Sequence, residues 1–191
     1  MGPAPARTRG TGLTDAVVAA AQAGDTDALG SVWTLLSPGV HGYLRTQGAE
    51  DPEGLTSEVF VQVIGRLGGM DGGASGLRTF VFSVAHARLV DERRRQARRQ
   101  PETSYDPERD PRRAVSAEAL AIEDEGERRA LAALHYLNEE QAMVITLRVL
   151  GDLTVEQAAR ALGKSPGAVK QLQRRGLLAL RRRVESGEVA L

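Results

Sequence analysis

The amino-acid sequence predicts an all-α fold made of two small helical domains that a flexible linker joins. The first observation is composition, since Ala and Leu dominate the apolar residues and only 4% of residues are aromatic, which favours helices over strands. The second is that apolar residues recur at helical spacing in both halves of the chain. The third is the stretch 101–117, which has three prolines, four acids and no helical period.

These observations predict four parts along the 191 residues. They are a disordered Gly-, Pro- and Arg-rich leader at 1–12, a first domain at 13–100, an acidic linker at 101–125 and a second domain at 126–191.

The first domain begins with helical segments of moderate length. Leu13 opens an Ala-rich helical stretch that ends near Gly24, and a second helix is expected from Ala28 to Leu36. Pro38 and the Gly after it predict a turn, because proline cannot donate the backbone hydrogen bond that a helix interior needs. A further short helix is expected at 40–44.

Two longer helices complete the first domain. Asp51 followed by Pro predicts a capped helix start, and the helix places Leu55, Val59, Val63 and Leu67 on one apolar stripe. A glycine-rich break at 68–73 precedes a long helix at 78–100, which is apolar in its first half and densely basic toward its end.

The last third of the chain predicts a helix-turn-helix. Asn138, Thr154 and Ser165 each suit the N-cap of a helix; the first two have Gln three residues on, and Pro166 follows the third. Gly163 ends the middle helix, so two short helices meet at a tight turn. The second helix leaves a basic, amide-rich face exposed, which is typical of DNA binding. An ordinary helical hairpin is the alternative.

Charge is segregated although the net charge is zero. Residues 86–100 hold six arginines and two acids, and residues 164–191 hold seven bases and two acids. These two basic patches, of net +4 and +5, predict two contacts with a polyanion. Solvated helix faces would also explain each patch taken alone.

Nothing in the sequence predicts catalysis, a metal site or a cofactor. There is no cysteine, and His41, His86 and His135 are isolated, with neither metal-ligand spacing nor a nucleophile nearby. The glycines at 68–76 lack the lysine of a phosphate-binding loop. No apolar run approaches the roughly 18 residues of a membrane span, so a non-enzymatic cytoplasmic protein is expected.

Two blocks of the chain resemble bacterial RNA polymerase sigma factors of the extracytoplasmic-function group. Segments 137–148 (LNEEQAMVITLR) and 153–170 (LTVEQAARALGKSPGAVK) resemble the fourth conserved region of that family. Segment 54–60 (GLTSEVF) resembles the polymerase-binding motif of the second region, and 77–91 (LRTFVFSVAHARLVD) with the arginines after it resembles the promoter-melting part.

The resemblance implies the partners and the site residues. Core RNA polymerase would be bound through its clamp helices and flap, promoter DNA at its −10 and −35 elements, and relatives often have an anti-sigma factor as well. The −35 element would be read by Ser165, Lys170, Gln171, Arg174 and Arg175. The −10 element would be bound and melted by His86, Arg88, Arg93, Arg94 and Arg95. Core polymerase would be contacted by Glu53, Glu58, Phe60 and Gln62.

The chain departs from the usual motifs of this family at four positions. Gly54 stands where relatives carry Asp, and Ser57 where they carry Gln, so two polar groups expected at the polymerase clamp are missing. Ala87 replaces an Asn and Phe80 a Trp in the melting segment. These departures bear on the strength of polymerase binding and on the promoter sequence.

Two other functions stay open at this point. One is a helix-turn-helix regulator that binds DNA without joining polymerase, which would have no use for the 54–60 and 77–91 blocks. The other is a recombinase-type enzyme with a helix-turn-helix tail, against which the lack of an acidic triad or a nucleophile–arginine cluster argues.

Overall fold

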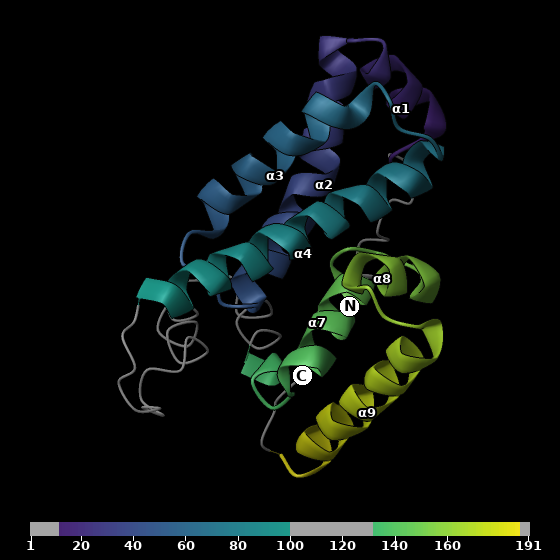
Figure 1. Cartoon of the computed structure of the whole chain (residues 1–191). Coiled ribbons are helices and arrows are strands. Elements are labelled where there is room, and N and C mark those ends of the chain that lie inside the picture. Colours follow the sequence, from purple (N-terminus) through teal and green to yellow (C-terminus); the bar gives the residue numbers. More distant parts are fainter. Residues whose placement is uncertain (1–11, 100–131, 188–191) are drawn as a thin grey trace, which may run out of the picture.

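The computed structural model describes residues 12–99 and 132–187, and within these ranges it contains helices and no strand (Figure 1). The all-α prediction is confirmed. The predicted leader, apart from Gly12, and the predicted linker lie outside the described residues. The helices are α1 (Asp15–Gln22), α2 (Thr26–Thr46), α3 (Pro52–Leu67) and α4 (Gly73–Arg99) in the first half, and α7 (Glu139–Val149), α8 (Val155–Leu162) and α9 (Pro166–Glu185) in the second.

Capping side chains start the first three helices. Thr14, Asp25 and Asp51 accept hydrogen bonds from backbone N–H groups three residues on, at 3.3, 2.8 and 2.8 Å. The apolar stripe that was predicted for α3 is buried along its whole length, from Leu55 to Leu67. Local sequence therefore accounts for where these helices begin and which face they bury.

The turn predicted at Pro38 is wrong, because α2 continues through this residue as one helix of 21 residues. Val32, Leu36, Val40 and Leu44 are all at most 1% exposed, and they form one stripe at four-residue spacing that crosses the proline. Burial of this continuous stripe against the other helices outweighs the backbone hydrogen bond that Pro38 cannot donate.

The long helix α4 begins at Gly73, five residues before its predicted start. Asp15, which lies 59 residues earlier in the chain, accepts a hydrogen bond of 2.7 Å from the backbone N–H of Ala74. Gly73 adopts φ +56°, and a Cβ there would collide with the Asp15 carboxylate. A tertiary contact therefore supplies the cap, which explains why no local signal marked this start.

The second half shows the predicted caps and turn. Asn138 and Thr154 both form capping boxes with the glutamine three residues on, and Ser165 caps α9 ahead of its first-turn proline. Gly163 takes the left-handed conformation, φ +62°, that ends α8. Helix α9 extends to Glu185.

The two halves pack against each other and share one buried apolar cluster. Helix α8 lies against α4, and α7 against α2 (Figure 1). The hydrogen bonds between them include one from Arg78 Nη1 to the Gly151 carbonyl at 3.1 Å. Gln157 Nε2 also donates to the Ser75 hydroxyl at 2.9 Å and to its carbonyl at 3.2 Å.

Small residues on α2 let α7 approach closely. A Cβ added to Gly39 would lie 2.7 Å from the backbone oxygen of Leu150, and one added to Gly42 would lie 2.9 Å from the Leu150 side chain. Both distances are shorter than real Cβ contacts. At Gly39 the atom met is backbone, so a larger residue there would push the halves apart, whereas at Gly42 the Leu150 side chain could shift instead.

Candidate nucleic-acid interface

Helices α8 and α9 form the helix-turn-helix, and α9 presents its polar face to solvent. Val169 is fully buried, and Gly176 lies so close to Ile145 and Gln141 of α7 that a side chain would crowd them. This packing turns the opposite face of α9 outward. The residues predicted to read DNA are all exposed: Ser165, Lys170, Gln171, Arg174 and Arg175.

Within residues 12–99 and 132–187, the basic residues of this face make no side-chain ion pair or hydrogen bond. Among the described residues, Lys170, Gln171, Arg174 and Arg175 have no ion pair or hydrogen bond through their side chains, so their donors remain available. The free N–H groups and positive dipole end of α9 lie beside Ser165 and favour a phosphate there. This surface can therefore hold a DNA backbone and reach base edges in a major groove.

An apolar patch continues along α9 beyond the predicted recognition residues. Leu177 and Leu178 are 49% and 43% exposed, and they line a shallow depression with Lys170, Arg174 and Arg181. Sequence reasoning missed these leucines because two adjacent apolar residues fit a helical core stripe as readily as a surface.

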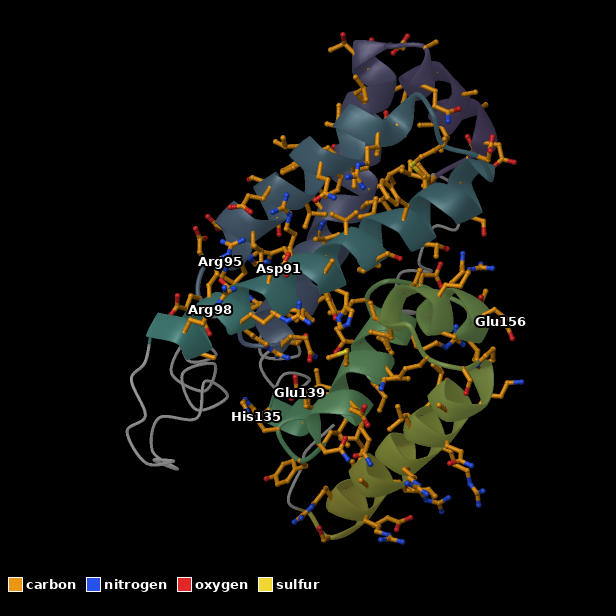
Figure 2. The ribbon with its side chains drawn as sticks, viewed as in Figure 1. Asp91, Arg95, Arg98, His135, Glu139 and Glu156 are labelled. Atoms are coloured by element: carbon orange, nitrogen blue, oxygen red, sulfur yellow. The ribbon has the colours of Figure 1, made fainter. Side chains whose placement is uncertain are left out.

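The predicted melting residues on α4 do not form one surface. Arg94 and Arg95 are exposed near its C-terminal end, and Figure 2 shows Arg95 there, with Glu139 at the start of α7 across from this end of the helix. Arg93 is half-buried, pairs with Glu139, and donates to the Gln47 carbonyl at 2.6 Å. Arg93 is thus engaged between the two halves, whereas Arg94 and Arg95 are exposed, and Arg94 has only an exposed pair with Asp91 at 3.9 Å.

His86 lies on an inner face of α4. Its Nδ1 shares a hydrogen bond of 3.0 Å with the Tyr43 hydroxyl. Burial lowers the pKa of His86, the positive charges of Arg93 and Lys164 lower it further, and Glu139 acts in the opposite direction. Burial also raises the pKa of Tyr43. The pair is therefore an uncharged polar contact near neutral pH.

The aromatic side chains of the melting segment are divided between core and boundary. Phe82 is 1% exposed and packs edge-to-face on Tyr43 at 6.2 Å between ring centroids, so it is a core residue. Phe80 is half-buried and packs on the same apolar cluster.

The α3 surface carries the residues predicted to contact polymerase, with one correction. Glu53 and Glu58 are exposed and Gln62 is partly exposed, but Phe60 is only 2% exposed. Its ring lies under Trp33 of α2, edge-to-face at 4.7 Å between centroids. Phe60 therefore supports this surface from below and cannot offer a contact of its own.

Exposed apolar residues on the same side were missed by the sequence reasoning. Val61 is 74% exposed, Ile64 44% and Trp33 41%. Val61 lies next to Phe60 in the chain but is turned about 100° away from it around the helix axis, so Val61 is exposed where Phe60 is buried. The signal that could have revealed them is their spacing, because Val61 and Ile64 are apolar but fall outside the buried stripe of α3.

The structure explains why glycine stands at position 54, where the family motif has Asp. The backbone N–H of Gly54 donates to the Asp51 carboxylate at 2.8 Å, and a Cβ at Gly54 would collide with that carboxylate. The Ser57 hydroxyl donates to the Glu53 carbonyl at 3.1 Å. The N-cap of α3 thus occupies the space that a larger side chain at position 54 would need.

Within residues 12–99 and 132–187 there is no group of three or more His, Cys, Asp or Glu side chains arranged to hold a metal ion. None of the helices in this part of the chain is long and apolar enough to cross a membrane.

Comparison with known proteins identifies relatives of both halves. Residues 133–182 match the family model of sigma-70 region 4. The chain is 31% identical to the ECF RNA polymerase sigma factor SigD of Mycobacterium tuberculosis in an alignment of 176 residues that covers 87% of this chain and 82% of the relative. It is 31% identical to the ECF RNA polymerase sigma factor BldN of Streptomyces coelicolor over 169 residues, again 87% of this chain but 64% of that longer relative.

A third relative and a solved structure are also similar to this chain. The ECF RNA polymerase sigma factor SigX of Bacillus subtilis is 30% identical in an alignment of 137 residues that covers 70% of each chain. The solved structure of CnrH in complex with the cytosolic domain of CnrY has a TM-score of 0.60 at 19% identity, covers 90% of this chain and 97% of that one, and shares the fold. The protein belongs to the family of ECF RNA polymerase sigma factors.

Proposed function

We propose that this protein binds core RNA polymerase as a sigma factor and directs promoter-specific transcription initiation, without catalytic activity of its own and in the cytoplasm. The observation that carries the proposal is the uncommitted basic face of α9, set on a helix-turn-helix in a chain whose relatives are sigma factors along most of its length. In this role α9 reads the −35 element, and Lys170, Arg174 and Arg175 neutralise phosphates or reach guanine edges.

The exposed end of α4 binds the −10 element in this proposal. Arg94 and Arg95 are placed to hold the backbone of the separated strands. Arg93 joins them only when its contacts with Glu139 and the Gln47 carbonyl open. The outer face of α3 binds the polymerase clamp through Glu58 and Gln62, with Val61 as an apolar contact.

Contact with both promoter elements requires the two halves to separate. The −10 and −35 elements are about 25 base pairs apart, or ~85 Å at ~3.4 Å per base pair. Helix α8 packs on both α4 and α9, and packed helix axes are about 8–10 Å apart, so α4 and α9 lie on the order of 20 Å from each other. We propose that polymerase holds the protein in an opened form.

Run-off transcription with purified core polymerase tests this function. Genomic fragments are transcribed with core alone and with core plus the protein, and specific transcripts are expected only in the second reaction. A regulator that does not join polymerase would bind fragments in the absence of core and yield no new transcript, which would refute the proposal. A pull-down from native cells then tests for an anti-sigma factor as a further partner.

A further inference from the structure

Arg88 and His86 lie on different faces of α4, although both were expected to bind promoter DNA. Positions 86 and 88 are two residues apart, which separates their side chains by about 200° around the helix axis. His86 faces Tyr43 of α2, with a hydrogen bond of 3.0 Å. Arg88 instead points to α3 and to the surface proposed to bind polymerase.

Arg88 joins two side chains of that surface. Its Nε donates a hydrogen bond of 3.0 Å to Gln62 Oε1, and its Nη1 lies 3.8 Å from Glu58 Oε2. Residues 58 and 62 are one helical turn apart, so they share one face of α3. The three side chains line a shallow depression together with Ser57, Val61 and Arg66.

This contact determines what a partner would meet on α3. Because the carbonyl oxygen of Gln62 accepts from Arg88, the amide N–H groups of Gln62 are directed away from Arg88 as donors. The Glu58 carboxylate is held beside the guanidinium and keeps an oxygen for accepting hydrogen bonds. The planar, multiply donating arginine side chain suits this bridging role, which the single ammonium of a lysine would not reproduce.

We propose that Arg88 is a positioning residue of the polymerase-binding surface, acting through Gln62 and Glu58, and is not a promoter contact. The inference rests on the proposed function. Its energetic basis is preorganisation, since two long side chains that are already ordered lose less conformational entropy on binding. The ion pair itself contributes little to folding, because Arg88 is 31% and Glu58 53% exposed.

The test measures the affinity of labelled protein for core polymerase by fluorescence anisotropy, and separately the affinity of the assembled holoenzyme for a single-stranded −10 oligonucleotide. Arg88→Ala is expected to weaken core binding about three- to tenfold, with an unchanged melting temperature and unchanged oligonucleotide affinity. Arg88→Lys keeps the positive charge but not the forked guanidinium, so its affinity for core should lie between those of the parent and Arg88→Ala. Arg160→Ala, which removes an exposed arginine of α8, is the matched control and should bind core as the parent does.

A double-mutant cycle separates positioning from direct contact. In a Gln62→Ala background, Arg88→Ala should cost much less core affinity than it costs alone, because its main acceptor is already gone. An equal loss in both backgrounds, an unchanged core affinity of Arg88→Ala, or a loss of oligonucleotide affinity alone would each overturn the inference. If the parent protein does not bind core at all, the proposed function fails instead, and the two failures are distinguishable.

Discussion

Substitution of Gly39 by Ala is expected to open the contact between the two halves while strengthening the helix that carries it. The added Cβ would lie 2.7 Å from the backbone oxygen of Leu150, against an ordinary contact of at least 3.4 Å. The halves must then move apart by roughly 0.7 Å at this point. The neighbouring hydrogen bond from Arg78 to the Gly151 carbonyl, now 3.1 Å, would stretch past the usual limit, at a cost of about 0.5–1.5 kcal/mol.

Gly30→Ala is a matched control in the same helix. Gly30 is exposed, and a Cβ there would meet nothing within 4 Å. Both substitutions remove a helical glycine and should favour α2 by up to ~1 kcal/mol. For Gly30→Ala this is a rise of about 4–8 °C in the melting temperature of a domain of roughly 60–100 residues, whereas in Gly39→Ala the cost of the opened contact offsets the gain. Only Gly39→Ala should disturb the second half.

Spin labels on the two halves would measure the separation. The chain has no cysteine, so Ser31→Cys on α2 and Glu156→Cys on α8 (Figure 2), both exposed, give a single labelled pair. The parent and Gly30→Ala should share one short, narrow distance distribution, and Gly39→Ala should give a longer and broader one. The same distribution in all three proteins would refute the reasoning that this close approach holds the halves together.

Three further predictions concern promoter binding, polymerase binding and pH. Arg174→Ala should weaken promoter binding by the holoenzyme and lower the slope of log affinity against log salt by about one, measured by titration at several salt concentrations. Ser57→Gln should tighten binding to core polymerase, measured by fluorescence anisotropy. Gly54→Asp should instead displace the Asp51 cap and lower the unfolding free energy by about 0.5–2 kcal/mol, measured by thermal melts. His86 has a lowered pKa, so the unfolded chain binds its proton more readily; stability should be complete above pH ~6.5 and fall as pH drops below it, and denaturant titrations of His86→Asn should lack that part of the slope.

The contradicting results for these three are specific. A salt slope equal to the parent's would remove Arg174 from the phosphate contacts. If Gly54→Asp melts at the parent's temperature, the Asp51 cap accommodates a side chain at position 54, and the cap does not explain why glycine stands there. An unfolding free energy of the parent that does not change between pH 7 and pH 5 would show that His86 is not held neutral.

Several elements of the fold and site followed from the sequence because their causes are local. The caps at Asp51, Asn138, Thr154 and Ser165 each satisfy backbone N–H groups within three residues, so a short stretch of sequence contains all the information. The left-handed Gly163 is local in the same sense, and so is the buried stripe of α3. The basic, exposed face of α9 then follows from helical periodicity and from which residues the core claims.

Other features depend on partners far away in the chain, and only the tertiary structure determined them. The start of α4 is capped by Asp15, and Phe60 is buried because Trp33 of another helix covers it. Arg88 faces α3, while Arg93 faces Glu139 of the second half. Two arginines of the same basic segment therefore lie on different surfaces. Periodicity tells which residues of a helix share a face, but the neighbour that this face meets is chosen by packing between helices, which sequence spacing does not encode.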